Sequence, residues 1–303
     1  MTQRVCVVGA NGYLGRHIAQ SLSADPALNS LHLCDLQAES IDHHAQYTQV
    51  DLRSAKSVGK IVQDSDFIFF FAGLTGTAQG FAAFRDFVEI NEIGLLNLLN
   101  ACRELSHKPK IIFPSTRLVY KGKKDVALKE DDEKEFKTIY ALNKYAGEQY
   151  LGIYADYFGV KYTVFRICVP YGTLLPGSLS YGTLSHFVSQ SKSGEVVVFG
   201  DGLQKRTFVN IGDLVRILLT ASFSPLTDNG IFNIGGADIL TIRYVAERIA
   251  SRYNARIKSV PWPEMAAKIE SGDTIFDSSK LDTLLVVQYH STFEKWAANL
   301  EVM

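Results

Sequence analysis

Short apolar runs alternate with longer segments of helical periodicity along the first half of the chain. The apolar runs lie at 4–8, 30–34, 47–50, 66–71, 110–113 and 162–166, and each has the length of a strand. Helical patterns fall near 13–22, 55–63, 84–105 and 138–158. Strands that alternate with helices pair in parallel and are covered on both faces. We therefore predict an α/β fold built on a doubly wound parallel sheet.

The alternation loosens after Arg166, where prolines and glycines become frequent and the apolar runs become shorter. We therefore predict two domains. Residues 1–166 form the sheet domain, to which parts of 208–234 return, and residues 167–303 form a smaller mixed lobe. A chain of 303 residues is long enough for such a two-lobed arrangement.

Three glycines, Gly9, Gly12 and Gly15, follow the first apolar run with two residues between each pair. Helical periodicity begins directly afterwards, which predicts a strand, a tight turn and a helix start. Glycine lets backbone approach a pyrophosphate, whose charge is stabilised by the N–H groups and the positive dipole end of the helix. The motif by itself also fits an ordinary turn.

Asp35 ends the second apolar run, about 20 residues after Gly15, where a carboxylate can bind both hydroxyls of an adenosine ribose. The same carboxylate repels a 2′-phosphate, and Leu36 and Gln37 supply no cation for one. The spacing therefore favours NAD over NADP, although Arg16 weakens this preference. The alternative is an aspartate that caps a turn at the end of a strand.

Tyr140 and Lys144 lie four residues apart in a predicted helix, so their side chains share one face. A free tyrosine has a pKa near 10, and a neighbouring ammonium stabilises the phenolate and makes it a usable base. Ser115 and Thr116 follow an apolar strand, where a hydroxyl could share the same substrate oxygen. Such a Tyr–Lys pair also occurs by chance on many helices.

Together these motifs resemble, nearly end to end, an extended short-chain dehydrogenase/reductase of the sugar-nucleotide epimerase and dehydratase group. Further segments in the family's order are Asp51-Leu52, Phe71-Ala72-Gly73-Leu74, Asn91 to Gly94, Pro114 to Tyr120, Phe165 to Gly172, Gly200-Asp201-Gly202 with Arg206 to Val209, and Ser271-Gly272-Asp273. The resemblance implies a Rossmann sheet with bound NAD and a C-terminal lobe that binds a nucleotide sugar.

The resemblance also assigns roles to individual residues. The catalytic residues are Thr116, Tyr140 and Lys144. The cofactor residues are Gly9, Asn11, Gly12, Tyr13, Leu14, Gly15, Asp35, Leu36, Asp51, Leu52, Phe71, Ala72, Gly73, Asn91, Tyr140, Lys144 and Val169. The substrate residues are Ser115, Thr116, Arg206 and Asp273.

The chain departs from the family's pattern at its substrate end. The dehydratases carry Asp-Glu after the catalytic threonine, and Arg117 and Leu118 stand there instead, so a dehydratase is rejected. Cys168 replaces a usual asparagine, and Glu270 replaces a usual arginine. Both family residues help to bind the substrate's diphosphate, so their loss weakens the case for an ordinary UDP-sugar.

These observations favour an NAD-dependent nucleoside-diphosphate-sugar epimerase that acts at C4 through a transient 4-ketosugar. One alternative is an NAD(P)H-dependent nucleotide-4-ketosugar reductase, and a weaker one is a catalytically silent, cofactor-binding regulatory protein. The predicted helices 84–105 and 138–158 are apolar over more than one face. A surface helix needs only one apolar stripe, so we expect a homodimer, which is also the family's usual arrangement.

The composition excludes several other classes of protein. A net charge of −1 offers no field for a nucleic acid or an anionic membrane. No apolar stretch reaches the roughly 20 residues of a membrane span, and the early strand leaves no room for a signal peptide. The four cysteines are scattered and lack the spacing of a metal site, so we interpret them as buried reduced thiols. We expect a cytoplasmic protein with no metal site.

Overall fold

The computed structural model describes residues 3–42, 45–173, 175 and 182–300. The chain divides into two compact units. The first comprises Met1–Val119, Thr138–Arg166 and Leu218–Phe232, and the second comprises Tyr120–Lys137, Ile167–Ile217 and Asn233–Met303. Residues 120–137 were expected in the sheet domain but group with the second unit, because β6 (Ala127–Leu128) pairs with β14 (Ile275–Phe276). The segment that returns to the first unit is 218–232, which lies within the range 208–234 from which parts were expected to return.

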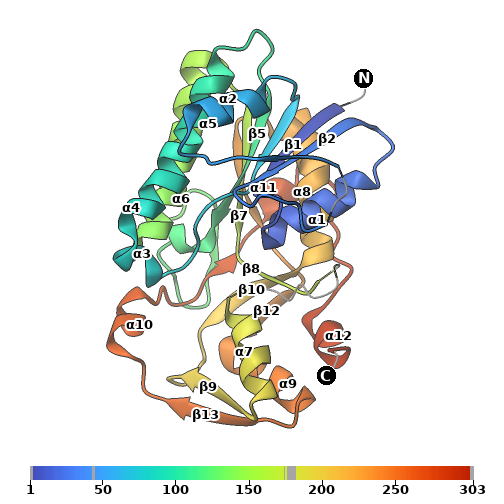
Figure 1. Ribbon diagram of the computed structural model, residues 1–303. Helices are drawn as coiled ribbons and strands as arrows, with labels where there is room; N and C mark the ends of the chain where they lie inside the picture. Colours follow the sequence, from blue (N-terminus) through green and yellow to red (C-terminus); the bar gives the residue numbers. More distant parts are fainter. Residues whose placement is uncertain (1–2, 43–44, 174, 176–181, 301–303) are drawn as a thin grey trace. The chain divides into compact units, whose positions relative to one another are not determined.

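A seven-stranded sheet forms the centre of the first unit (Figure 1). Its strand order is β11-β7-β5-β4-β1-β2-β3, and the β3–β2, β2–β1, β1–β4 and β4–β5 pairs are parallel. The strands are β1 (Gln3–Val8), β2 (Leu28–Asp35), β3 (Gln46–Gln49), β4 (Phe67–Phe70), β5 (Lys110–Thr116), β7 (Tyr162–Ile167) and β11 (Gly230–Ile234). The predicted doubly wound sheet is confirmed.

Helices cover both faces of this sheet. Apolar side chains of α2 (Ala55–Val62), α5 (Gly94–Arg103) and α6 (Ile139–Phe158) form one buried cluster with alternate residues of the strands. On the other face lie α1 (Tyr13–Ser23) and α8 (Ile211–Phe223), and the Phe223 ring packs edge-on against Phe67 and Phe69. Alternate strand residues thus meet different helices, as expected for side chains that alternate between faces.

The helix predicted over 84–105 is interrupted. After α3 (Gln79–Ala82), α4 (Phe84–Val88) leads into a π-helical turn, η1 (Glu89–Ile93), and α5 follows. π-Turns inside helices often occur at functional sites. Here the turn contains Asn91, whose side chain makes two hydrogen bonds with the backbone of Leu74.

The second unit is built from short elements. A three-stranded sheet has the order β12-β10-β8, and β13 pairs with β9. Its elements are β8 (Val169–Tyr171), α7 (Thr183–Lys192), β9 (Glu195–Phe199), β10 (Lys205–Asn210), β12 (Asp238–Thr241), α9 (Ile242–Arg252), β13 (Arg256–Val260), α10 (Glu264–Ile269), α11 (Ser279–Asp282) and α12 (Phe293–Ala298). Two 3-10 turns, η2 (Arg117–Val119) and η3 (Pro225–Thr227), lie in the first unit.

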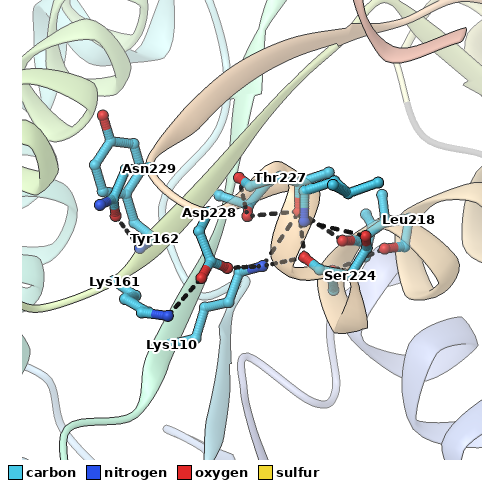
Figure 2. A network of polar contacts seen from close by, with 12 residues as sticks. Lys110, Lys161, Tyr162, Leu218, Ser224, Thr227, Asp228 and Asn229 are labelled. Atoms are coloured by element: carbon cyan, nitrogen blue, oxygen red, sulfur yellow. Dashed lines mark hydrogen bonds and ion pairs between the residues drawn. The ribbon is translucent and has the colours of Figure 1, made fainter. Parts of the chain in front are cut away.

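A polar network joins β5, the start of β7 and the loop before β11 at one edge of the large sheet (Figure 2). The buried Lys110 ammonium lies 2.8 Å from Asp228 Oδ1 and donates to the carbonyl of Ser224. Lys161 pairs with the other carboxylate oxygen of Asp228 at 2.6 Å. Burial lowers the pKa of Lys110, and Asp228 partly restores it. These contacts stabilise the charge of Lys110 at the start of the buried strand β5.

Across the described residues, no helix combines the length and the apolar character needed to cross a bilayer.

Candidate active site

The glycine turn between β1 and α1 is tightly built. Gly9 has a φ of +90°, and a Cβ there would lie 2.4 Å from the backbone nitrogen of Ala72. A Cβ on Gly15 would lie 2.0 Å from the carbonyl oxygen of Gly9. Gly12 is the N-cap of α1 and has no side chain to cover the first N–H groups of the helix. A helix N-terminus of this kind, without a side-chain cap, is suited to binding an anion.

A pocket of about 290 Å³ opens beside this turn. Ten of the predicted cofactor residues line it: Gly9, Asn11, Gly12, Asp35, Leu36, Asp51, Leu52, Phe71, Ala72 and Gly73. Tyr13, Leu14 and Gly15 form the first turn of α1 behind it, and Val169 lies in the second unit. The sheet therefore gathers residues from the ends of β1, β2 and β4 around one cavity. This cavity fits one half of a dinucleotide bound in an extended conformation.

Asp35 ends β2 with both carboxylate oxygens held by backbone. Oδ2 accepts the N–H of Asn11 at 2.9 Å, and Oδ1 accepts the N–H of Leu36 at 2.7 Å. Arg16, the residue that weakens the cofactor preference, forms a two-pronged ion pair with Asp42 at 2.7 and 2.8 Å. Arg53, which also lines the pocket, is held by Asp51 at 2.7 Å. Each of these two guanidinium groups already has a carboxylate partner.

The predicted catalytic residues come from β5 and α6. Thr116 is the last residue of β5 and is buried, and its hydroxyl oxygen accepts the N–H of Leu118 at 3.3 Å. Tyr140 is half-buried in the first turn of α6, whose N-cap Thr138 accepts the N–H of Ala141. Lys144 lies one turn further along the same face.

Lys144 is buried, and its ammonium lies 4.5 Å from the centre of the Phe113 ring. Burial lowers its pKa to about 8, while Glu148 acts in the opposite direction. A lysine in this environment is still largely protonated at neutral pH. It can therefore stabilise an anion on the same helix face, as the Tyr140 phenolate would require.

A buried network next to the Tyr140–Lys144 pair was missed by the sequence reasoning. Glu148 accepts hydrogen bonds from Ser115 at 2.5 Å and from Arg166 at 2.9 and 2.5 Å. The Ser115 hydroxyl, predicted to bind substrate, is thus engaged with Glu148. The available signal was spacing, because Tyr140, Lys144 and Glu148 follow one another at intervals of four residues.

Asn91 was predicted to bind the cofactor, and the structure places it against the pocket wall. Its side-chain amide donates to the carbonyl of Leu74 at 3.0 Å, and its oxygen accepts the Leu74 N–H at 2.8 Å. Gly73, with a φ of +155°, passes so close that a Cβ would lie 2.8 Å from the Asn91 oxygen. Asn91 therefore shapes the segment after β4 that lines the pocket.

The two predicted substrate residues of the second unit also have partners. Arg206 on β10 is buried and donates to the side chain of Glu270 and to the carbonyls of Gly272 and Lys205. Asp273 accepts the backbone N–H groups of Lys205 at 2.8 Å and Asp125 at 3.0 Å. Glu270, where the family usually has an arginine, therefore neutralises Arg206.

Cys168 is buried in the second unit. Its thiol lies 3.4 Å from the carbonyl oxygen of Thr274 and donates to it. Val169, the next residue, begins β8. The asparagine that the family usually has at position 168 would offer an amide here. The Cys168 thiol instead donates to a carbonyl of the second unit itself.

Several curated proteins and solved structures are similar to this chain. A Bacillus subtilis (strain 168) protein named as an uncharacterized UDP-glucose epimerase is 27% identical over 266 residues, 82% of this chain and 83% of its own. A UDP-N-acetyl-alpha-D-glucosaminuronate decarboxylase of Bacillus cytotoxicus is 26% identical over 88% of this chain and 85% of its own. The UDP-glucose 4-epimerase of Thermus thermophilus, solved with NAD, superimposes with a TM-score of 0.84 at 24% identity, covering 97% of this chain and 96% of its own.

The family model described as the NAD dependent epimerase/dehydratase family matches residues 5–235. That range includes the glycine turn, the cofactor pocket, Thr116 and the Tyr140–Lys144 pair. The match confirms the expectation of an NAD-dependent enzyme of this type. The chain belongs to the NAD dependent epimerase/dehydratase family.

Proposed function

We propose that this protein is an NAD-dependent nucleoside-diphosphate-sugar 4-epimerase. The observation that carries the proposal is the placement of Tyr140 and Lys144 on one face of α6, with Lys144 buried against Phe113 at 4.5 Å. Thr116, at the end of β5, supplies the third group. The glycine turn and the pocket that contains Asp35 fit the dinucleotide, because side chains on Gly9 or Gly15 would collide with backbone.

In this proposal Tyr140, as the phenolate, removes the proton of the sugar's C4 hydroxyl. Thr116 donates a hydrogen bond to the same oxygen, and Lys144 stabilises the phenolate and binds the nicotinamide ribose. NAD, which the glycine turn and the pocket that contains Asp35 would hold, would supply the hydride acceptor at C4 and the hydride that returns to the other face of the ketosugar. Tyr140 would return the proton to the oxygen.

The substrate end is proposed to differ from that of an ordinary UDP-hexose enzyme. Arg206 is proposed to contact the substrate's diphosphate, since a planar guanidinium can pair with two phosphate oxygens. In the structure it is already paired with Glu270, so a diphosphate must compete with a carboxylate. We therefore expect weak turnover of UDP-glucose and better turnover of another nucleotide sugar.

The test is to purify the protein, dialyse it extensively and measure the remaining NAD by absorbance after denaturation. An epimerase regains its cofactor in every cycle and should retain it, whereas a ketosugar reductase must release it. The protein is then supplied with UDP-, dTDP-, GDP- and CDP-sugars, and C4 epimers are separated by chromatography. Retained NAD with no epimer from any sugar would favour the silent regulatory protein. Turnover only with added NADH or NADPH would favour the reductase.

NAD is expected to bind more tightly than NADP by more than about tenfold, or 1.4 kcal/mol. The reason is that Asp35 bonds ribose hydroxyls and repels a 2′-phosphate, while Arg16 and Arg53 are each paired with a carboxylate. Titration of apo-protein with each cofactor measures the ratio. Asp35→Ala should reduce the ratio of NAD affinity to NADP affinity. Asp64→Ala, which removes an exposed carboxylate, should leave this ratio unchanged. Equal affinities in the wild-type protein would contradict the preference.

The rate is expected to fall as the pH rises through about 8, the pKa of Lys144. Burial lowers this pKa, so the ammonium loses its proton at a lower pH than an ordinary lysine does and no longer stabilises the phenolate. The pH profile of kcat/KM measures the effect. Lys144→Arg should remove this alkaline fall, even if the rate is lower, because a guanidinium stays protonated. An unchanged profile in that variant would assign the fall to another group.

We also propose a homodimer. Apolar side chains remain exposed on the helices that cover one face of the first unit's sheet: Phe84, Val88, Ile93, Leu142, Ile153 and Tyr157. Light scattering at micromolar concentration should give twice the monomer mass, and Ile153→Lys should shift it toward the monomer. A monomer mass for the wild-type protein would remove the proposal.

We place the protein in the cytoplasm, where its four buried cysteines would stay reduced.

A further inference from the structure

Two cysteines and a histidine, distant in the sequence, meet on one face of the large sheet. On the parallel strands β1 and β2, Cys6 lies directly opposite His32, and Cys34 follows two residues later. Residues two apart on a strand point to the same face. One potential ligand atom from each residue lies within 4.8 Å of the others. Among the described residues, this is the one group of three or more such side chains that could hold a metal ion.

The distance between the two thiols fits a shared metal ion. Cys6 Sγ and Cys34 Sγ lie 3.8 Å apart. Zinc binds thiolates at about 2.3 Å in a tetrahedron, which places two sulfur ligands roughly 3.8 Å from each other. A disulfide requires an S–S distance of about 2.05 Å, so the two sulfur atoms are not bonded to each other. The observed spacing therefore suits metal coordination better than a covalent link.

The histidine is already oriented by its other neighbour. His32 Nε2 lies 2.8 Å from the hydroxyl of Thr48 on the adjacent strand β3. Metal-binding histidines usually have one ring nitrogen held in this way, and Nδ1 is the nitrogen that remains for a ligand bond. The His32 side chain is half-buried, whereas both thiols are buried. Access to the site is therefore from the histidine side.

We propose that Cys6, His32 and Cys34 form a binding site for one Zn²⁺ ion. Two thiolates and an imidazole are a donor set that zinc prefers, and three protein ligands leave a fourth position for water. Binding replaces the protons that remain on the two thiols, which pass to the buffer. The metal and both sulfur atoms keep their oxidation states.

The site lies directly beneath the glycine turn. The carbonyl of Cys34 accepts the N–H groups of Gly9 at 2.8 Å and Ala10 at 3.0 Å. A metal that joins β1 to β2 at Cys34 would therefore also hold the backbone that forms the cofactor turn. On the basis of the proposed function, zinc is expected to tighten NAD binding.

The experiment titrates the full chain, reduced and freed of metal with a chelator, with Co²⁺ as a spectroscopic substitute for Zn²⁺. A thiolate-to-cobalt charge-transfer band should rise to one equivalent, and added Zn²⁺ should abolish it. Cys6→Ala, Cys34→Ala and His32→Ala should each weaken binding more than about 100-fold, because losing even a supporting partner costs about 10–100-fold. Cys102→Ala removes another buried thiol of the same core and should leave the band unchanged.

Circular dichroism and urea unfolding show whether each variant is folded, and Cys34→Ser provides a second, polar replacement of the same ligand. The proposal is overturned if the wild-type protein gives no charge-transfer band, or if folded Cys34→Ala and Cys34→Ser variants retain it. Loss of the band in Cys102→Ala alone would equally overturn it. These results are independent of epimerase activity, so they separate the metal site from the proposed reaction.

Discussion

Tyr140→Phe is expected to reduce turnover by about 10²–10⁴-fold, the usual effect of losing a general base. The variant keeps the aromatic ring in the first turn of α6 and removes only the oxygen that carries the proton. Retained NAD should therefore be unchanged, because the glycine turn, Asp35 and Lys144 are intact. The measurement is the initial rate with the best nucleotide sugar, together with cofactor content.

Tyr157→Phe is the matched control, since Tyr157 lies on the same helix and is 79% exposed. It should leave the rate within a few-fold of the wild-type value. Activity of Tyr140→Phe in that same range would rule Tyr140 out as the base. Loss of bound NAD in Tyr140→Phe would instead assign the residue to cofactor binding.

Glu148→Ala is expected to lower the free energy of unfolding by about 3–5 kcal/mol, because it leaves the buried guanidinium of Arg166 without its counter-charge. The side chains of Glu148 and Arg166 are 0% and 3% exposed, so water cannot replace the missing carboxylate. The Ser115 hydroxyl loses its acceptor as well. Urea unfolding followed by circular dichroism measures the change.

Glu104→Ala serves as its control. Glu104 pairs with Arg103 at an exposed site, where such a pair contributes about 0–1 kcal/mol. Glu148→Gln keeps hydrogen-bonding atoms but removes the charge. We expect its loss of unfolding free energy to lie between those of Glu148→Ala and Glu104→Ala. A loss below about 1 kcal/mol in folded Glu148→Ala would show that Arg166 finds another partner.

The amino-acid sequence by itself determined the parallel sheet and the glycine turn after its first strand. Local signals were sufficient there, because apolar runs, helical periodicity and turn glycines are properties of neighbouring residues. The Tyr140–Lys144 pair was visible for the same reason, since helical spacing places i and i+4 on one face. The homodimer and the substrate remain proposals.

Only the tertiary structure decided which distant residues meet. It joined Ser115, Glu148 and Arg166 into one buried network and paired Arg206 with Glu270. The helix predicted over 84–105 contains a π-turn at Asn91. The side chains of Cys6, His32 and Cys34, from two neighbouring strands, lie close together. Strand register and the packing of helix on sheet set these contacts between residues that are distant in the sequence, and the sequence pattern does not show which of those residues will meet. Side-chain chemistry can be read along the chain, but the partner that neutralises or orients it depends on the fold.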